Sequence, residues 1–335
     1  MKVAVIGGGI NGVMTAWAFA RRGDVVDLYE RGSLMSATSR ASTKMLHGGL
    51  RYLEHGHLAL VREALLERSW WVKQAPHLAT PLELLIPVFG NDGRSRWIVG
   101  SGLKLYDLLA RGSGFPTSRW YPADEVVKRF PVLRRERLKG AYGYWDARMD
   151  DYRLGLWAVA RASAAGVRMH EQTPVLAIDP ESGRIRTPLL ADTYDRIVNA
   201  AGPWASSLLA QCGIGSAYRL DLVRGSHIVI GGRLDQGCVL QAPGEKRILF
   251  VLPHGEHTLI GTTEVGQSNP DDCAPSNEEL DYLVGNYNRF FSSGLSRQGI
   301  VSSFAGIRPI VASKPDFSAA SRESVIERQG KLINV

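Results

Sequence analysis

Cysteine is scarce in this sequence, and long apolar runs are absent from it. The three cysteines, Cys212, Cys238 and Cys273, stand far apart and form no C-x-x-C pair. This spacing argues against a disulfide framework or a structural metal site and is typical of a reducing compartment. No run of about 18 apolar residues occurs, so we expect no helix that spans a membrane. The apolar start breaks at Gly7, too early for the core of a secretory signal peptide, so we predict a cytoplasmic location.

Internal repeats and low-complexity tracts are also absent. The 335 residues are 44% hydrophobic and 22% charged, a globular composition that leaves room for two domains. The formal net charge is +7. A basic surface favours anionic partners such as a phosphorylated small molecule, acidic lipid headgroups or nucleic acid, although many basic proteins have no such partner. No aromatic and basic motif accompanies the charge, so we predict no nucleic-acid binding.

The first 31 residues hold the most informative pattern of the chain. Residues 3–6 form a short apolar run typical of a buried parallel strand, and residues 11–21 predict an apolar helix. A second apolar strand, residues 25–29, ends at the acidic residue Glu30. This order of strand, glycine-rich turn, helix and strand is typical of a unit that binds a dinucleotide.

Three glycines, Gly7, Gly9 and Gly12, have the G-x-G-x-x-G spacing between the first strand and the helix. The first allows the tight turn, the second lets the backbone approach a pyrophosphate, and the third lets the helix pack closely on the sheet. Free N–H groups at the start of the helix then face the phosphates. Glu30 stands where a carboxylate accepts hydrogen bonds from a ribose, which disfavours the 2′-phosphate of NADP. The motif predicts a dinucleotide site and leaves NAD and FAD open.

A second segment of small residues, NAAGPWA at 199–205, follows a predicted strand at 196–199. Small residues after a strand let a loop pass close to a bound cofactor, although an ordinary strand-to-helix turn has a similar composition. No second G-x-G-x-x-G follows a strand. We therefore expect one tightly held dinucleotide and not a flavin together with a nicotinamide.

Changes in pattern along the chain predict an α/β fold with two interleaved domains. Residues 217–267 indicate strands of an antiparallel sheet with a hairpin near His254 and Gly255, and a capping box from Ser276 to Glu279 starts a helix. We predict a Rossmann-like dinucleotide domain interrupted by a cap domain with a mixed antiparallel sheet. The first comprises residues 1–70, 146–215 and 301–335, and the second comprises residues 71–145 and 216–300. Ligands bind at such junctions.

The stretch STKMLHGGLRYLEHG, residues 42–56, gathers polar side chains around two glycines. With VIGGGINGV, APHL, NAAGPWA, VRGSHIVI, FVLPHGEHTLIGTTEV and AGIRPI, it resembles the aerobic, respiratory FAD-dependent glycerol-3-phosphate dehydrogenases, within the D-amino-acid-oxidase-like flavoproteins. The resemblance covers nearly the whole chain, and HGGLRYLE is its most specific motif. It implies a Rossmann-like FAD-binding domain with a mixed-sheet cap domain for the substrate.

The resemblance also implies a reaction and a location. The family oxidises C2 of sn-glycerol 3-phosphate to give dihydroxyacetone phosphate, with hydride passing to N5 of FAD and electrons onward to a quinone. Its members are usually peripheral membrane proteins, so attachment to the inner face of the cytoplasmic membrane is expected. We also expect a homodimer.

The resemblance assigns residues to the cofactor. Those expected to hold its adenosine and pyrophosphate side, or to lie near the adenine, are Gly7, Gly9, Gly12, Glu30 and Val175. Those expected along the flavin are Thr38, Ser39, Ser42, Lys44, His47, Gly48 and Gly49. Further contacts are expected from Arg31, Ala201, Gly202 and Trp204.

The resemblance assigns the substrate to Arg51, Tyr52 and Arg308, with Thr262 and His227 on the cap side. A phosphate dianion needs fixed donors, and arginine supplies paired hydrogen bonds while staying charged. Arg308 is therefore expected to serve catalysis as well as binding. Alcohol oxidation also needs a base for the hydroxyl proton, a role that suits a histidine with a near-neutral pKa. His47 and His227 are the two candidates.

The resemblance stops at RQGKLINV, the last residues of the sequence. In the family a Phe-Gly-Gly-Lys segment and a helix follow at once, often with a helical domain, and they close on the flavin and supply a lysine to the substrate. We therefore expect a truncated chain with weakened FAD retention and activity.

Two other functions stay open. An amine or D-amino-acid oxidase of the same superfamily needs an arginine for a carboxylate, and Arg308 would serve, although HGGLRYLE favours the dehydrogenase. An inactive dinucleotide-binding scaffold is the other alternative, which the ending of the sequence would permit.

Residues 94–112 combine apolar and basic side chains at helical spacing. Such a helix lies on an anionic membrane surface or packs on its own core. The residues concerned are Trp97, Ile98, Leu103, Leu105 and Leu108 together with Arg94, Arg96, Lys104 and Arg111.

Overall fold

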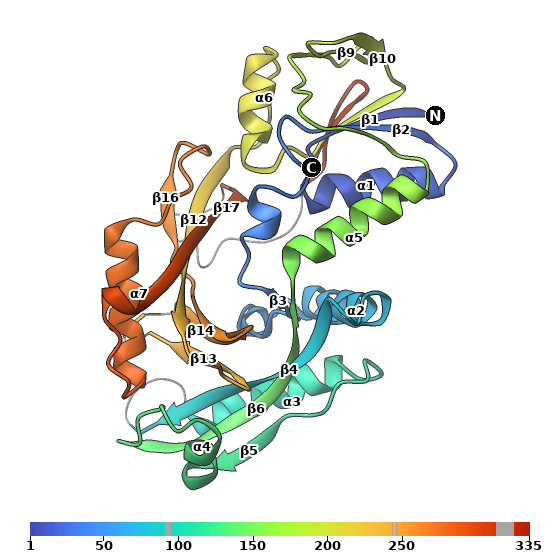
Figure 1. Cartoon of the computed structure of the whole chain (residues 1–335). Coiled ribbons are helices and arrows are strands. Elements are labelled where there is room, and N and C mark those ends of the chain that lie inside the picture. Colours follow the sequence, from blue (N-terminus) through green and yellow to red (C-terminus); the bar gives the residue numbers. More distant parts are fainter. Residues whose placement is uncertain (91–94, 243, 246, 313–324) are drawn as a thin grey trace.

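The computed structural model describes residues 1–90, 95–242, 244–245, 247–312 and 325–335. Two sheets dominate these residues, one of six strands and one of ten, and a three-stranded sheet accompanies the first. Figure 1 shows the six-stranded sheet in the upper part of the molecule and the ten-stranded sheet below it. Both chain termini lie at the six-stranded sheet.

The six-stranded sheet contains the predicted strand–helix–strand unit. In spatial order its strands are β18 (Glu327–Gln329), β19 (Leu332–Asn334), β11 (Arg196–Asn199), β1 (Lys2–Ile6), β2 (Val25–Tyr29) and β7 (Arg168–His170). Neighbours pair in parallel except β18 with β19. Helix α1 (Ile10–Arg21) connects β1 to β2, so the glycine turn opens at the carboxyl end of β1, as predicted.

Both faces of this sheet are buried, because alternate residues of β1 belong to two different cores. Val3 and Val5 pack with α1 and α5 (Asp151–Ala164), whereas Ala4 and Ile6 pack with α6 (Ala205–Gln211). The second face also contacts the three-stranded sheet, formed by β8 (Ala177–Asp179), β9 (Arg184–Arg186) and β10 (Ala191–Thr193). Burial on both faces explains the continuous apolar runs of β1 and β2.

The ten-stranded sheet is mostly antiparallel. Its main path is β16 (Val265–Gln267), β12 (Leu220–Gly231), β15 (His257–Gly261), β14 (Ile248–His254), β13 (Gly237–Gln241), β4 (Ala79–Phe89), β6 (Leu138–Met149) and β3 (Met45–Leu46). In addition, β17 (Ile300–Val311) pairs with β12, and β5 (Arg119–Pro122) pairs with β6. The long β4–β6 and β12–β17 pairs form the frame on which the other strands are arranged.

Helices cover both faces of the ten-stranded sheet. One core packs it against α4 (Ala123–Arg129) and α7 (Asn277–Phe290), and the other against α2 (Leu58–Gln74) and α3 (Arg96–Leu109). Short 3-10 helices are η1 (Thr38–Arg40), η2 (Leu50–His55), η3 (Gly202–Trp204) and η4 (Arg297–Gly299). The segment that contains η1, β3 and η2 leads from the six-stranded sheet to the ten-stranded one, so it lies where the two meet.

The local predictions are confirmed with small shifts. The predicted strands at 3–6, 25–29 and 196–199 correspond to β1, β2 and β11, and α1 begins one residue earlier than expected. The hairpin at His254 joins β14 to β15. The capping box is present, since the Ser276 side chain accepts from the N–H of Glu279 and the Glu279 side chain accepts from the N–H of Ser276.

Sheet membership differs from the predicted domain ranges most clearly at β17 and β3. Residues 300–311 form β17, which pairs with β12 from Leu220↔Val311 to Ile230↔Ile300 and so belongs to the ten-stranded sheet. β3 also joins that sheet through β6, although it falls within the range 1–70. The predicted range 301–335 therefore contains strands of both sheets, because a strand's partner far along the chain leaves no local signal in the sequence.

Helix α3 accounts for most of the predicted amphipathic segment, of which Arg94 lies outside the described residues. Leu103 is fully buried, whereas Trp97 and Ile98 are 79% and 61% exposed. The helix therefore packs on its own core along one side and presents apolar side chains to solvent at its start. None of the described helices is both long and apolar enough to cross a membrane.

Candidate active site

The glycine turn after β1 has no room for a side chain at two positions. Gly7 has a φ of 111°, and a Cβ there would lie 2.3 Å from the carbonyl oxygen of Ala200. A Cβ on Gly12 would lie 1.9 Å from the carbonyl oxygen of Gly7. The start of α1 is thus pressed against the ends of β1 and β11. This is the close packing that the G-x-G-x-x-G spacing predicts.

Neighbouring loops fix polar groups around this turn. The Ser39 hydroxyl oxygen accepts a hydrogen bond of 2.9 Å from the N–H of Ile10, at the start of α1. A Cβ on Gly9 would come within 3.0 Å of the same oxygen. The Glu30 carboxylate accepts from the N–H groups of Gly8 at 2.6 Å and Gly32 at 2.7 Å. Glu30 is therefore fixed at the end of β2, beside the turn, with oxygens that are acceptors only.

Arg31 and Trp204, both predicted to contact the cofactor, meet through Asp271. The Asp271 carboxylate accepts from Arg31 Nη2 at 3.0 Å and from Trp204 Nε1 at 2.8 Å. The Arg31 guanidinium also lies 4.1 Å from the centre of the Trp204 ring. These hydrogen bonds, that of Arg31 first, lower the pKa of the Asp271 carboxyl. Sequence reasoning missed Asp271, since no motif surrounds it in the loop between β16 and α7.

Three further residues predicted to contact the cofactor lie around the same end of the sheet. Val175 is buried in the core with Ile6 and Tyr29. The Cα of Ala201 would lie 2.9 Å from a Cβ on Gly7, so the two loops touch. Gly202, with a φ of 56°, starts η3.

The predicted flavin residues Ser42 and Lys44 share a partner in Asp151, at the start of α5. Asp151 accepts hydrogen bonds from the N–H and hydroxyl of Ser42, at 3.0 and 2.7 Å, and an ion-pair contact of 2.6 Å from Lys44 Nζ. Lys44 adopts a left-handed backbone, with a φ of 61°. Asp151 therefore fixes the chain as it leaves η1. Sequence reasoning missed it, because Asp151 is more than a hundred residues away.

A cavity of about 1540 Å³ extends along η2, α3 and the inner strands of the ten-stranded sheet. The predicted site residues that line it are Thr38, Ser42, His47, Gly49, Arg51, Tyr52, Thr262 and Arg308. A second cavity, of about 1320 Å³, is lined by Arg31, Lys44 and Trp204 among others. Thr38 and Ala41 line both cavities, so the two adjoin at η1. Several residues predicted for the site do not line the larger cavity, as far as the described residues show. Among them are Lys44, Gly48 and His227.

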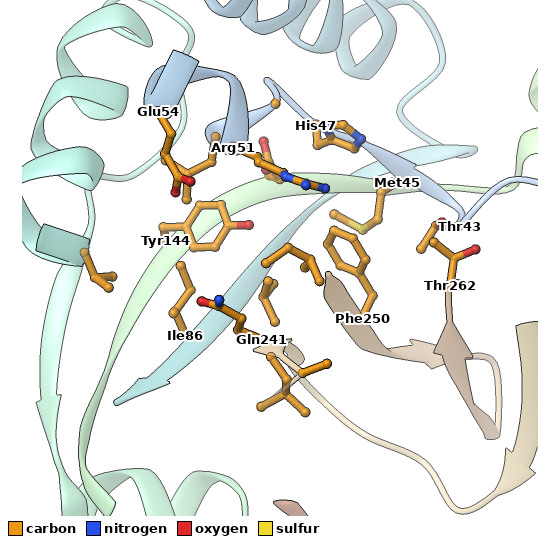
Figure 2. A pocket seen from close by; sticks show the side chains of 18 of the residues that line it. Thr43, Met45, His47, Arg51, Glu54, Ile86, Tyr144, Gln241, Phe250 and Thr262 are labelled. Atoms are coloured by element: carbon orange, nitrogen blue, oxygen red, sulfur yellow. The ribbon is translucent and has the colours of Figure 1, made fainter. Parts of the chain in front are cut away.

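The larger cavity has a polar end and an extended apolar wall. Figure 2 shows Arg51 reaching into it from η2, with His47 beside it and Thr43 and Thr262 at one end. Ile86 and Phe250 provide part of the apolar wall, from β4 and β14. The arrangement combines cationic and hydroxyl groups at one end with a long apolar surface beyond them.

Arg308 is held in the cavity wall by neighbours on the ten-stranded sheet. Its Nη2 donates to the Thr262 hydroxyl oxygen at 3.1 Å, and its Nη1 lies 3.6 Å from Glu264. A Cβ on Gly225 would come within 2.5 Å of Nη2, so a larger residue there would displace the guanidinium. Arg308 and Thr262, both predicted to contact the substrate, thus contact each other, and Glu264 is an additional carboxylate that sequence reasoning missed.

The two candidate histidines have different environments. His47 is exposed and lines the cavity. His227 is 1% exposed, and its ring stacks on Phe304 with 4.9 Å between ring centres. Its Nε2 lies 3.0 Å from the hydroxyl oxygen of Thr43. Burial, followed by the positive charges of Arg308 and Lys44, lowers the pKa of His227 to about 3, so the ring is neutral in ordinary buffers.

Comparison with known proteins decides the family. The model of the FAD dependent oxidoreductase (DAO) family matches residues 2–331, nearly the whole chain. The chain is a member of that family. FAD is thus the cofactor of this oxidoreductase family, as the resemblance implied.

Curated relatives of this FAD-dependent oxidoreductase include two sugar- or polyol-phosphate enzymes. D-erythritol 1-phosphate dehydrogenase of Brucella abortus is 35% identical over 96% of this chain and 66% of its own length. Aerobic glycerol-3-phosphate dehydrogenase of Escherichia coli is 36% identical over 93% of this chain and 64% of its own length. The chain therefore spans somewhat less than two thirds of the curated relatives it matches.

Solved structures agree with this family assignment of the oxidoreductase. Glycerol-3-phosphate dehydrogenase of Bacillus halodurans, complexed with FAD, superposes with a TM-score of 0.78 at 26% identity, covering 100% of this chain and 60% of that one. Glycine oxidase of Geobacillus kaustophilus superposes with a TM-score of 0.70 at 21% identity, over 99% of this chain and 87% of that one. At that identity, the second likeness shows the fold alone.

The residues of this FAD-dependent oxidoreductase fit its family's cofactor on two counts. At Gly7 and Gly12 a Cβ would collide with neighbouring backbone, so the turn and the start of α1 pack closely on the ends of β1 and β11, as a turn that binds a pyrophosphate requires. The two adjoining cavities are lined by residues that adjoin both sheets, with Arg31 and Trp204 in one cavity and Arg51 and Arg308 in the other. A long, two-part ligand suits such a shape better than a compact one.

Proposed function

We propose that this chain oxidises the secondary hydroxyl of a small polyol phosphate, converting sn-glycerol 3-phosphate to dihydroxyacetone phosphate. The observation that carries the proposal is the meeting of Arg51, Arg308 and Thr262 in one cavity that adjoins the second, cofactor-side cavity. Two cationic forks beside a hydroxyl are suited to a phosphate with a neighbouring alcohol. The names of relatives at 35–36% identity support the same substrate class.

The cofactor roles in this proposal follow the geometry of the turn and the loops around it. The glycine turn and the start of α1 would hold the pyrophosphate, and Glu30 would accept from the ribose. Ser42 and Lys44, fixed by Asp151, would face the flavin from the segment after η1. When bound, the flavin supplies the acceptor for the hydride that leaves C2. The chain's own task is to orient the alcohol, bind the phosphate and take the hydroxyl proton.

His47 is our choice for the base. It lines the cavity, whereas His227 is buried behind Thr43 and has a pKa of about 3, too low for a group that must hold a proton near neutral pH. In this proposal His227 orients the Thr43 hydroxyl, which lines the cavity, and does not itself remove the proton. The proton of the C2 hydroxyl passes to the imidazole of His47.

A longer polyol phosphate is a second candidate substrate. The larger cavity is about 1540 Å³, above the usual range of roughly 300–1,000 Å³ for small-molecule sites. Glu54 and Gln241 line its wall away from Thr262 and present oxygens and an amide suited to further hydroxyls. The erythritol phosphate dehydrogenase among the relatives favours this alternative.

An anaerobic titration tests the proposal. The FAD-loaded chain would be mixed with glycerol 3-phosphate, erythritol 1-phosphate or a D-amino acid, and the visible flavin absorbance recorded. Bleaching by glycerol 3-phosphate supports the proposal, and faster bleaching by the four-carbon phosphate favours the second candidate. Bleaching by the amino acid alone would assign the chain to the oxidases. If no substrate bleaches the FAD-loaded protein, the inactive dinucleotide-binding scaffold is the alternative that remains.

The acceptor and location follow as proposals from the same family assignment. We propose that electrons leave to a quinone and that α3 attaches the protein to an anionic membrane at the inner face of the cytoplasmic membrane. The exposed Trp97 and Ile98, beside Arg96 and Lys104, are suited to such a surface. Co-sedimentation with anionic liposomes that is lost on Trp97→Ser supports attachment, and equal sedimentation of both proteins contradicts this role of α3. A homodimer stays a prediction from the resemblance.

A further inference from the structure

A fully buried ion pair lies directly behind the Gly48–Gly49 turn and has no role in the chemistry described so far. Arg68 of α2 donates through Nη1 to Asp146 of β6 at 2.7 Å, and both side chains are 1% exposed. Tyr106 of α3, 2% exposed, donates its hydroxyl to the same Asp146 oxygen at 2.7 Å. Three elements thus bring polar groups to one point in the core.

The group meets the main chain at the carbonyl oxygen of Trp145, which accepts from Arg68 Nη1 at 2.8 Å, and at one N–H, that of Gly48. Gly48 donates to the Tyr106 hydroxyl oxygen at 2.8 Å and also approaches Asp146 Oδ1 at 3.3 Å. A Cβ on Gly48 would lie 2.4 Å from Leu65 Cδ2 and 2.5 Å from the Tyr106 oxygen. The backbone of Gly48 is therefore pressed against this group with no intervening space.

The turn so anchored sets the two cavity residues on either side of it. Gly49 has a φ of 71° and is followed at once by η2, which contains Arg51. His47 precedes the turn, and both side chains line the larger cavity. A displacement of Gly48 would therefore move the cation and the histidine together relative to Arg308, which is fixed independently on β17.

A contribution to folding stability does not by itself explain why this ion pair is buried. Burying two charges costs about as much as their pairing returns, so an apolar substitute of similar volume is often as stable. The pair is also incompletely satisfied, since among the described residues Nε and Nη2 of Arg68 have no hydrogen-bond partner. The guanidinium lies instead 3.8 Å from the centre of the Phe115 ring. A geometric role explains both the burial and the convergence on one N–H.

We propose that Arg68, Tyr106 and Asp146 are positioning residues that fix the Gly48–Gly49 turn and thereby the distance of His47 and Arg51 from Arg308. The inference rests on the proposed function for its kinetic consequence, but the anchoring of Gly48 is independent of substrate. Burial, followed by the Asp146 charge, raises the pKa of Tyr106 well above its usual value, so the phenol stays protonated as a donor.

The decisive variant is Tyr106→Phe, which removes one hydroxyl and keeps the Arg68–Asp146 pair. Its matched control is Tyr121→Phe, because Tyr121 is also buried and also donates to a carboxylate, Glu83, at 2.6 Å, but lies in the core on the other face of the sheet. Amide hydrogen exchange of the peptide spanning residues 44–53 is measured first, on the FAD-loaded chain. We expect exchange at Gly48 to be at least about tenfold faster in Tyr106→Phe and unchanged in Tyr121→Phe.

Single-turnover flavin reduction by glycerol 3-phosphate is measured on the same proteins. We expect Tyr106→Phe to reduce its flavin about 10- to 100-fold more slowly at saturating substrate, because a displacement of about 1 Å costs that much. The control should keep the wild-type rate. Asp146→Asn should show the same two effects more strongly, and if it does not fold, the pair of tyrosine variants still decides.

The outcomes separate the inference from the proposed function. If wild type is not reduced by a polyol phosphate, the proposed function fails, while the exchange comparison still judges the anchoring of Gly48. If the two tyrosine variants exchange alike, or if Tyr106→Phe exchanges faster yet reduces its flavin at the wild-type rate, the positioning role is overturned.

Discussion

The two ends of the site use different kinds of chemical group. At the six-stranded sheet the groups around the glycine turn are mainly backbone N–H groups and a carboxylate, supplied by residues within the first 32 of the chain. At the ten-stranded sheet they are side chains from distant segments, with Arg51 on η2, Thr262 after β15 and Arg308 on β17. The backbone groups depend on the local conformation of the glycine turn. The side chains depend on the tertiary fold, which brings Arg51, Thr262 and Arg308 into one cavity.

This difference predicts where a single methyl group should matter most. Gly12→Ala would place a Cβ 1.9 Å from the carbonyl oxygen of Gly7, so the start of α1 must move away from β1. We expect the flavin content of the purified protein to fall to about a tenth of wild type or less, because the N–H groups at the start of α1 move away from the position that a pyrophosphate would occupy. The measurement is the ratio of visible to ultraviolet absorbance.

The control for this change is the same substitution in another helix. A Cβ on Gly285 of α7 would meet no neighbouring atom within 4 Å, so Gly285→Ala should keep full flavin content. It should also raise the free energy of unfolding by about 0.5–1 kcal/mol, because alanine favours the helix. Equal flavin content in the two variants would contradict the close-packing account of the turn.

The glycine-turn end of the site was more predictable from the sequence than the side-chain end. The strand–turn–helix–strand unit and Glu30 were predictable, because the residues concerned are neighbours and their spacing has a geometric meaning. Asp151, Asp271 and the Asp146 group were not, because each acts on residues a long way off in the chain. The pairing of β17 with β12 was not predictable for the same reason. For the side-chain end, the resemblance named residues such as Arg308 and Thr262, whereas spacing by itself did not.

The two histidines test the side-chain end. We expect His47→Asn to slow single-turnover flavin reduction by about 10²- to 10⁴-fold, the usual contribution of a general base. His227→Asn should slow it by less than about tenfold, because His227 reaches the cavity only through Thr43. If both variants reduce at the wild-type rate, neither histidine is the base; if only His227→Asn is slow, the assignment is reversed.

Arg308 tests whether the side-chain end recognises a phosphate by geometry or by charge alone. Arg308→Lys keeps the charge but loses the planar fork that meets Thr262 and Glu264. We expect KM for glycerol 3-phosphate to rise about 10- to 100-fold, with a smaller change in kcat. Arg233→Lys, at an exposed arginine that contacts Glu256 at 3.2 Å, should change neither. An unchanged KM in Arg308→Lys would remove Arg308 from phosphate binding.

The smallest expected effect concerns pH and again separates the two ends. His227 has a folded-state pKa of about 3, below the ordinary 6.5, so the unfolded chain binds a proton between these values while the folded chain does not. Stability should therefore fall as the pH drops below about 6.5, by at most about 1.4 kcal/mol per pH unit from this group. Between pH 6.5 and 5 the loss from this group is between about 1 and 2 kcal/mol, because the unfolded histidine is only half protonated at pH 6.5.

Most carboxylates titrate below this window, so histidines dominate the slope within it. Burial, followed by Lys44, also lowers the pKa of His254, and that contribution remains when His227 is replaced. His227→Asn should accordingly show a flatter dependence of its unfolding free energy on pH between 6.5 and 5, measured by denaturant titration, whatever its absolute stability. Equal slopes in wild type and variant would mean that the His227 ring takes up a proton in the folded protein, and its role behind Thr43 as a fixed neutral group would then be untenable.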